Sequence, residues 1–393
     1  MKIIILLSFL SLPFFINAQK EIPISKVIHD DLDFSIQQYM RMANVLKSQE
    51  GLLPKTFKDG KLVTCASDWW TSGFFPGSLW YLYEYSGNDD VKKMSELFTS
   101  RVENQKYTTN NHDVGFMIYC SFGNGYRITA NDSYKDVILT ASKSLSTRYR
   151  PTVGCLRSWD WGKWEFPVII DNMMNLELLF WSSHFPGCEN YYNIAVSHAN
   201  VTMANHFRPD FSCYHVVSYD TITGKAKIKE TRQGFSDASS WARGQAWALY
   251  GYTMTYRETK DSRYLKHARN VANFILNHKN LPADKIPYWD FDAPDIPNTF
   301  RDSSAGAIIC SALIELSQYV GKDTAELYLD VAEKQIRVLS SSKYRASLGG
   351  NGNFILMHGV GSIPQLSEID VPLSYADYYY IEALMRYKKL LKL

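Results

Sequence analysis

Two aspartates stand at the heads of strongly apolar segments, where carboxyl groups could perform acid/base chemistry. Asp113 follows His112 and precedes Val-Gly-Phe-Met-Ile-Tyr, and Asp171 lies within Ile-Ile-Asp-Asn-Met-Met-Asn. Two carboxyl groups in one pocket suit proton transfer at a glycosidic centre. Aspartate is also a favoured helix N-cap, so the alternative is that both residues only cap helices. Asn175 favours the pocket, because it places a second polar group one helical turn after Asp171.

An arginine inside another apolar segment is the next candidate. Arg243 lies in Trp241-Ala-Arg-Gly-Gln-Ala-Trp247, and Ser239, Arg243 and Trp247 are four residues apart and share a helix face. A buried arginine needs a partner. One possibility is an internal carboxylate. The other is a substrate carboxylate, which the planar guanidinium fits well, and the flanking tryptophans favour a sugar acid.

A tryptophan-rich loop indicates a sugar platform. Trp159, Trp161 and Trp164 fall within six residues outside any apolar helix, which is unusual for core residues. Flat rings of this kind stack on the apolar faces of pyranoses. Trp70, in the pair Trp69-Trp70, is a weaker case of the same kind. The alternative for all of them is ordinary packing, which accounts for most aromatic residues of a chain that is 14% aromatic.

Twelve helix-length segments would position these side chains. Six are amphipathic, with charges on one side: Leu32–Lys47, Val91–Glu103, Ser133–Ser146, Tyr191–Phe207, Ser262–Asn277 and Ala325–Ser340. Six are apolar on nearly every side: Gly73–Tyr85, Asp113–Tyr126, Asp171–Ser182, Ser239–Tyr256, Ser303–Tyr319 and Ser374–Tyr387. The two sets alternate strictly. Because a helix that is apolar all round must be buried all round, we predict an all-α (α/α)6 barrel, a six-hairpin toroid with an inner apolar and an outer amphipathic ring. An open solenoid of helical pairs is the alternative.

The long connections precede the apolar segments, so we expect them all on one face, beside the aspartates. Long loops in a compact domain are usually functional. Strands are predicted only within 214–229, as a hairpin turning at Tyr219-Asp-Thr-Ile-Thr-Gly224. No linker is visible, so residues 19–393 are predicted to form one domain.

The remaining composition narrows the functional classes. Lys2, the apolar run Ile3–Phe15 and a small residue at Ala18 predict a signal peptide over residues 1–18, and hence an exported, periplasmic or secreted protein. Nothing later resembles a membrane span. A formal net charge of +2 argues against nucleic acid. Six cysteines without a Cys-x-x-Cys pair, and no His-Glu-x-x-His, predict no metal site.

Several motifs together resemble the unsaturated glucuronyl hydrolases, over most of the mature chain. They are His112-Asp113-Val-Gly-Phe, Ile170-Asp171-Asn-Met-Met-Asn175, Trp241-Ala-Arg243-Gly-Gln-Ala-Trp247, Phe291-Asp-Ala-Pro, Arg301-Asp302-Ser-Ser-Ala, Glu368-Ile-Asp-Val-Pro-Leu and Tyr375-Ala-Asp377-Tyr-Tyr. Together these motifs are highly specific. The resemblance implies an (α/α)6 barrel, no cofactor, and substrates ending in the Δ4,5-unsaturated uronic acid that polysaccharide lyases leave behind.

The resemblance also assigns roles. Asp171 matches the family's proton donor and water activator, and Asp113 its second essential carboxylate. The positions that match the lining of the site are His112, His215, Gln233, Trp241, Arg243 and Trp247, with looser matches at Trp70, Trp159 and Tyr375. The implied reaction hydrates the C4=C5 vinyl ether and so releases the terminal sugar from glycosaminoglycan oligosaccharides. The expected partner is that oligosaccharide, and the protein is expected to be a monomer or a weak homo-oligomer.

Three rival functions remain open at this point. The related unsaturated rhamnogalacturonyl hydrolases act on pectin fragments with the same fold, but the motifs at His112-Asp113 and Trp241–Trp247 favour the glucuronyl type. A glycan-binding toroid without activity is a second rival, against which the presence of both aspartates speaks. A conventional inverting glycosidase is the third.

Overall fold

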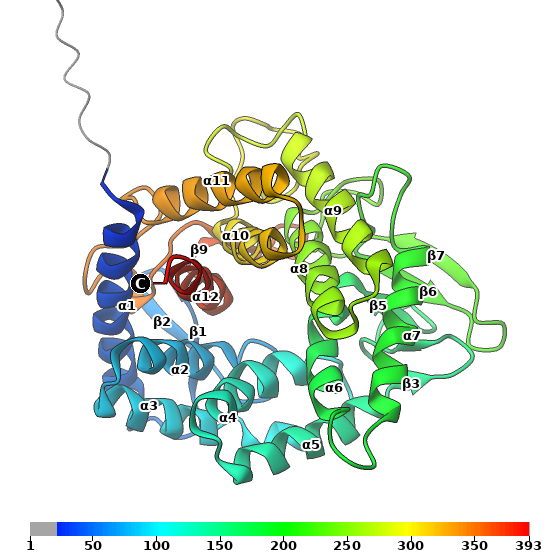
Figure 1. Ribbon diagram of the computed structural model, residues 1–393, viewed down its shortest axis with the longest axis horizontal. Coiled ribbons are helices and arrows are strands. Elements are labelled where there is room, and N and C mark those ends of the chain that lie inside the picture. The colour runs from blue at the N-terminus through cyan, green and yellow to red at the C-terminus, as the bar shows by residue number, and fades with distance from the viewer. Residues whose placement is uncertain (1–21, 393) are drawn as a thin grey trace, which may run out of the picture.

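The computed structural model describes residues 22–392, and within them the chain forms two concentric rings of helices (Figure 1). The outer ring consists of α1 (Ile24–Leu46), α3 (Asp89–Ser100), α5 (Asp132–Ser146), α7 (Asn190–Asn205), α9 (Ser262–Asn277) and α11 (Lys322–Leu339). The inner ring consists of α2 (Phe74–Ser86), a π-helix (Gly115–Gly123) that continues into α4 (Asn124–Thr129), a 3-10 helix (Ile170–Asn175) that continues into α6 (Leu176–Ser182), α8 (Ala242–Thr259), α10 (Ser303–Leu316) and α12 (Ser374–Leu390). The predicted signal peptide lies outside the described residues.

The ring is closed, which confirms the (α/α)6 barrel. The last inner helix, α12, packs against both α10 and α2, and α1 contacts both α2 and α12. An open solenoid would leave its first and last repeats apart. All residues of α10 are buried, as the uniformly apolar sequence of that helix requires. No helix in the described part of the chain combines the length and apolarity needed to cross a bilayer.

Local sequence accounts for where several helices start. Asparagine or aspartate side chains accept hydrogen bonds from the first free amides of α3, α5, α9 and α10; these caps are Asn88, Asn131, Asp261 and Asp302. Such caps satisfy amides that have no partner within the helix. The heads of the inner segments at Asp113 and Asp171 differ, because neither aspartate caps its helix.

Two inner helices begin in geometries that were not predicted. The π-helix Gly115–Gly123 has a wider turn than an α-helix, and the 3-10 helix Ile170–Asn175 a tighter one. They meet where Gly115 lies against Asn175. A Cβ atom at Gly115 would fall 2.6 Å from the Asn175 Cα, so only glycine permits this approach. π-Helical turns are frequent at functional sites.

The prediction of strands only within 214–229 was too restrictive. The hairpin there is confirmed as β6 (Val216–Tyr219) and β7 (Ala226–Glu230), joined by β5 (Pro167–Ile169) in one sheet. Three further two-stranded pairs were missed: β1 (Leu53–Lys58) with β2 (Lys61–Cys65), β3 (Tyr149–Arg150) with β4 (Cys155–Leu156), and β8 (Gly359–Ser362) with β9 (Ser367–Val371). Asp59-Gly60, both at positive φ, is the turn signal that could have revealed the first of these.

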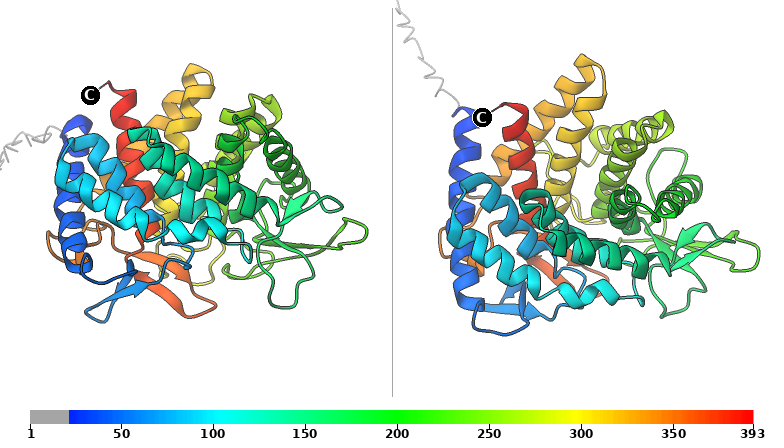
Figure 2. Two further views of the ribbon diagram at one scale, coloured as in Figure 1. Left: turned by 90° about the horizontal axis from the view of Figure 1, so that it is seen from below. Right: turned by 60° about the horizontal axis from the view of Figure 1, so that its bottom comes forward.

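The hairpins lie at the end of the barrel away from the C-terminus (Figure 2). This is the end where the inner helices begin, so the long loops gather there as predicted. Aromatic rings from the π-helix, α8 and α12 pack against one another inside the barrel. Phe116 and Trp247 are 5.3 Å apart between ring centroids, and Trp247 and Tyr379 are 5.4 Å apart. We call these three rings the aromatic layer.

Candidate active site

Asp113 and Asp171 lie at the N-terminal ends of neighbouring inner helices. The two helices are joined at this point, because the Phe116 amide donates a hydrogen bond of 2.9 Å to Oδ1 of Asn175. The side-chain oxygen of Asn175 therefore links the two helices, whereas its buried Nδ2 has no hydrogen-bond partner within the protein. The charge of Asp113 raises the pKa of Asp171, so the two carboxyl groups lie within electrostatic reach of each other.

Both carboxyl groups are mostly enclosed, yet each remains accessible. The side chain of Asp113 is 21% exposed and that of Asp171 is 11% exposed. Burial raises the pKa of Asp113 to about 7, against the influence of Arg148. Burial also raises the pKa of Asp171 to about 7; Arg243, the Asp171 backbone amide and Trp247 oppose this, and Asp113 adds to it. A carboxyl group of this kind can donate a proton near neutral pH.

A histidine faces each aspartate. His112 Nε2 is 3.4 Å from Oδ1 of Asp113, and His215 Nε2 is 3.6 Å from Oδ2 of Asp171. The backbone amides of Arg232 and Gln233 both donate to Nδ1 of His215, at 3.2 Å each. That nitrogen must therefore be the acceptor, so the proton is assigned to Nε2, on the side of Asp171.

Burial keeps both imidazoles neutral. It lowers the pKa of His112 to about 3 and, together with Arg243, lowers the pKa of His215 well below its usual range. His112 is also fixed by its backbone, whose amide donates to the Ser158 carbonyl at 3.0 Å. The site thus combines two protonatable carboxyl groups with two neutral hydrogen-bonding rings.

Arg243 uses its guanidinium within the protein. Nη2 donates to the Gly361 carbonyl at 2.7 Å, Nη1 donates to the Val360 carbonyl, and Nη1 lies 3.5 Å from Asp302 Oδ2. Of the two alternatives for this arginine, the internal carboxylate is the one observed. Arg243 holds strand β8 against the head of α8, and only its Nε has no partner within the protein. Its charge still acts on Asp171, whose pKa it lowers.

Aromatic rings surround this arginine and the space beside it. Trp241 and Tyr375 lie 4.5 and 5.3 Å from the Arg243 guanidinium, measured to the ring centroids. Trp241 also contacts His215, with 4.4 Å between ring centroids. Trp70 lies 4.9 Å from Tyr375 by the same measure. These predicted residues therefore form one continuous group.

The tryptophan loop lies beside His112. Trp159 pairs with Asn111 in an isolated β-bridge, which places the loop at the mouth. Its ring stacks on Trp161 with centroids 4.8 Å apart and planes inclined by 12°. Trp159 is buried, whereas Trp161 is 51% exposed. The exposed ring of the predicted platform is therefore Trp161, which packs on Trp159 and has the Arg232 guanidinium 4.4 Å from its centroid.

Many polar atoms at this end have no hydrogen-bond partner within the protein. They belong to His112, Trp159, Asp171, Asn175, His215, Arg243, Trp247 and Tyr375, all predicted site residues. Buried polar groups usually have partners, so these atoms are available to bind a polar ligand or water. Gln233 differs, since its Nε2 reaches the Gly361 carbonyl at 3.5 Å. The inner helices also begin here, and helix N-termini favour anions.

Sequence reasoning missed residues that shape the mouth. Asp302 holds Arg243, caps α10 through Ser304, and accepts from the Val360 amide. Its position in a quoted motif was the available signal. Lys55 was missed entirely, and Glu368 was noted only as part of a quoted motif. Lys55 Nζ lies 3.7 Å from Glu368 Oε1 and 4.0 Å from the Trp69 ring centroid, so two distant hairpins meet there.

A closed helical toroid with two accessible, neutral-range carboxyl groups and a tryptophan platform at one mouth has the features of a carbohydrate-active enzyme. No family model matches the chain. It is 50% identical over 325 residues to an unsaturated glucuronyl hydrolase of Formosa agariphila, covering 82% of this chain and 80% of that protein. It is 36% identical to an unsaturated chondroitin disaccharide hydrolase of Streptococcus pneumoniae, covering 81% and 82%.

Among solved structures, an unsaturated glucuronyl hydrolase described as specific for heparin superposes with a TM-score of 0.91. It is 45% identical and covers 94% of this chain and 99% of that chain. The protein therefore belongs to the unsaturated glucuronyl hydrolase family, as the motifs predicted, and is a glycoside hydrolase.

Proposed function

We propose that the protein removes the terminal Δ4,5-unsaturated uronic acid from oligosaccharides produced by glycosaminoglycan lyases, by hydrating the C4=C5 bond. The single observation that supports this most is the pair of accessible carboxyl groups, Asp113 and Asp171, whose pKa values are both raised to about 7. A vinyl ether needs a protonated acid near neutral pH before water can add, and this pair offers one.

Asp171 is the proposed acid and base. Its carboxyl proton is transferred to C4 of the sugar, and positive charge develops at C5 and the ring oxygen. The resulting carboxylate then takes a proton from water as the hydroxyl adds to C5. The hemiketal opens to a ketone, which leaves a hemiacetal at C1 that releases the remaining glycan. Because no direct displacement occurs at C1, the usual link between carboxylate separation and stereochemistry does not apply.

Neighbouring groups support both forms of Asp171. The Nε2 proton of His215, 3.6 Å away, is available to the carboxylate that forms after proton transfer. Asp113 raises the pKa of Asp171 by like-charge repulsion and is suited to bind sugar hydroxyls through its exposed oxygen. General acid–base action of this kind supplies about 10²–10⁴-fold in rate, so positioning by the surrounding rings must supply more.

The carboxylate group of the uronic acid explains why the substrate would bind at this end of the barrel. Helix N-termini of the inner ring and the positive charge of Arg243 favour an anion at this end. Among glycosaminoglycan products we place those of heparin first, since the relative described as specific for heparin is more similar to this chain than the chondroitin disaccharide hydrolase is.

Loss of the ultraviolet absorbance of the conjugated double bond tests this function. We expect decay with disaccharides made by heparin, chondroitin or hyaluronan lyases, fastest with the heparin products. Flat traces with all three, together with decay on unsaturated rhamnogalacturonyl products, would instead assign the pectin activity. Reaction in heavy water distinguishes the chemistry, because hydration places deuterium at C4 and simple hydrolysis places none.

We further propose that residues 1–18 are removed during export and that residues 19–393 work as one domain in the periplasm or outside the cell. The charged Lys2 and the apolar run Ile3–Phe15 support this. We also propose that the protein is a monomer or a weak homo-oligomer. N-terminal sequencing of the secreted protein and light scattering test the two proposals.

A further inference from the structure

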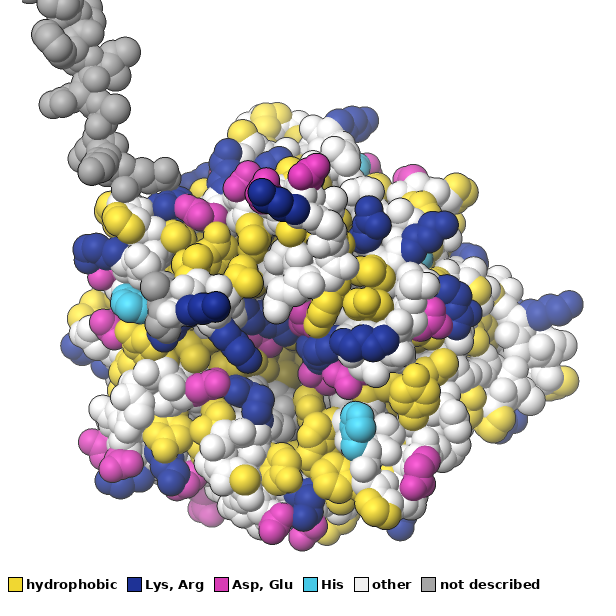
Figure 3. All heavy atoms as spheres, in the orientation of Figure 1, with side chains coloured by type: hydrophobic (Ala, Val, Ile, Leu, Met, Phe, Trp, Pro, Cys, Tyr) yellow, Lys and Arg dark blue, Asp and Glu magenta, His cyan; other side chains and the backbone are white. Residues whose placement is uncertain are grey.

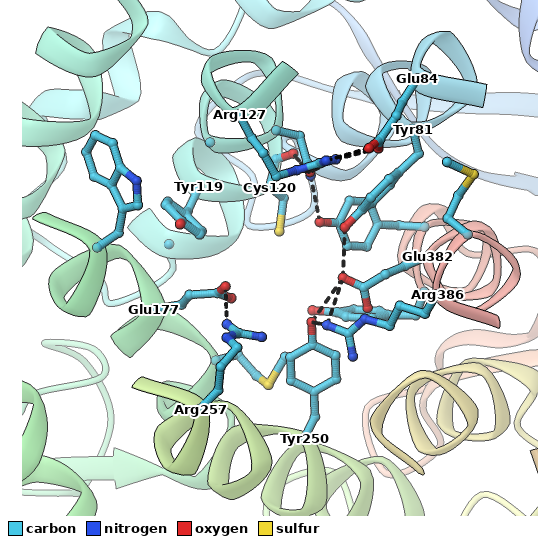
Figure 4. Close-up of a pocket in the computed structure, with 18 of the residues that line it drawn as sticks. Tyr81, Glu84, Tyr119, Cys120, Arg127, Glu177, Tyr250, Arg257, Glu382 and Arg386 are labelled. Atoms are coloured by element: carbon cyan, nitrogen blue, oxygen red, sulfur yellow. Dashed lines mark hydrogen bonds and ion pairs between the residues drawn. The ribbon is translucent and has the colours of Figure 1, made fainter. Parts of the chain in front are cut away.

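A second cavity occupies the opposite end of the barrel, where the inner helices end. Its volume is about 780 Å³, within the range of pockets that hold small molecules. Side chains from five inner helices line it and point into one space (Figure 4). They include Tyr119, Arg127, Glu177, Trp181, Arg257 and Lys389.

This far cavity is separate from the carboxylate mouth. Gly115, Met174 and Tyr379 are among its lining residues, so it extends down the barrel to the aromatic layer. Trp247, which belongs to the aromatic layer, reaches Asp171 and lowers its pKa, and neither Asp113 nor Asp171 lines the far cavity. A ligand in the far cavity would therefore not contact the carboxyl groups of Asp113 or Asp171.

Aromatic rings form one wall of the far cavity. Tyr119 and Trp181 are half-buried although they belong to the inner ring, and their ring centroids are 6.3 Å apart. Tyr126 packs against Trp181 at 5.3 Å with planes inclined by 78°, which fixes the indole. Partly exposed, fixed rings inside a pocket offer the faces on which pyranoses stack.

Charged groups form the rest of the lining. Five lysines and arginines line the cavity with four glutamates, and Glu315 behind them also pairs with Arg257 and Arg386. Arg257 is fixed by Glu177, Glu258 and Glu315, and Arg127 makes a bidentate pair with Glu84 at 2.7 Å. Figure 3 looks onto this end and shows lysine and arginine side chains gathered around the central hollow. Lys389 is exposed at the rim.

A role in stability alone explains only some features of the far cavity. Cations at helix C-termini are stabilised by the helix dipole, which accounts for a basic rim. It does not account for an open cavity that retains half-buried rings. We propose that the far cavity is a second binding site for an anionic saccharide, with its ring against Tyr119 and Trp181 and its acidic group at the basic rim. This goes beyond the proposed hydrolysis, which uses the other mouth.

Calorimetric titration with a saturated hyaluronan disaccharide tests the proposal, because that probe has a carboxylate but no C4=C5 bond to hydrate. We expect binding that Lys389→Glu weakens about fivefold, the effect of reversing one exposed charge. Lys322→Glu, the same change on the 85%-exposed outer side chain of α11, should leave affinity unchanged. Trp181→Ala should weaken binding about tenfold through lost ring contact.

Further titrations show which of the two sites binds the probe and whether its negative charge is needed. Binding should persist in Trp161→Ala, which removes the exposed ring at the carboxylate mouth, and the hydrolysis rate should be unchanged in Lys389→Glu. Chitobiose, which has no acidic group, should bind more weakly. No binding at millimolar probe, binding sensitive to Trp161→Ala but not to Lys389→Glu, or equal affinity for chitobiose would each overturn the proposal.

Discussion

His215 presents its Nε2 proton to Asp171 across 3.6 Å, while two backbone amides hold its other nitrogen. This arrangement fixes the tautomer without using a second side chain. It also keeps a neutral donor beside a carboxyl group whose charge changes during the reaction. The two atoms are not hydrogen-bonded at this distance, so the donor must approach the carboxylate as its charge develops, which is where such donors act most strongly.

Removing this donor should slow the reaction more than it weakens binding. We expect His215→Phe to lower kcat about 10–100-fold with a smaller change in KM. The pKa governing the reaction should rise, because the carboxylate loses its donor. His215→Gln keeps an amide donor and should recover part of the rate. An unchanged pH profile in His215→Phe would contradict this role and would mean that the His215 side chain contributes only to packing.

Asp171→Asn should abolish proton transfer. The amide keeps the size of the side chain but cannot donate the proton, so we expect a loss of at least about 10²–10⁴-fold in the absorbance assay. Asp295→Asn, an exposed aspartate in the loop before α10, is the matched control and should keep full activity. Equal activity of the two variants would remove the acid role from Asp171.

The pH dependence of activity follows from the raised pKa values. Asp171 must be protonated at the start of the reaction, so kcat/KM should fall as pH rises through about 7. Asp113 also has a pKa of about 7 and interacts with Asp171. The fall of kcat/KM with rising pH therefore reports the titration of the pair rather than of one residue. A pH-rate profile checks this. A rate that rises steadily between pH 6 and 8 would be the opposite result.

The same groups should affect stability. In the unfolded chain these aspartates lose their protons near pH 4, while the folded state keeps them until about 7. The folded state therefore binds more protons between these values, and its free energy of unfolding falls as pH rises through this window. Asp171→Asn removes one such group. The free energy of unfolding, measured by denaturation at pH 4.5 and 7.5, should therefore fall less between these two pH values in the variant than in the parent.

Asp302 should be important for both stability and activity, because it holds a buried arginine. In Asp302→Ala, Arg243 loses its carboxylate and α10 loses its cap, so we expect about 3–5 kcal/mol of destabilisation. Asp302→Asn keeps a capping oxygen and should lose less. Urea denaturation measures the difference between the two. Equal stability of both variants would show that the charge of Asp302 is unimportant.

Periodicity was sufficient to predict the rings, because each helix carries its own burial pattern. It also located Asp113 and Asp171, which head apolar segments. It did not indicate that Arg243 would donate to the Val360 carbonyl, 117 residues later, since strand β8 has no strong alternating pattern. Turn geometry set by close contact, such as the π-helix beside Asn175, likewise depends on a distant partner that local sequence does not specify.

The two stacked tryptophans should separate binding from folding. Trp161 is 51% exposed, so Trp161→Ala should raise KM while leaving the free energy of unfolding almost unchanged. Trp159 is buried beneath it, and Trp159→Ala should cost about 3–5 kcal/mol of stability as well as affinity. Initial rates and urea denaturation of both variants make the comparison. The platform assignment fails if Trp161→Ala keeps the parent KM, because the accessible ring would then not contact sugar.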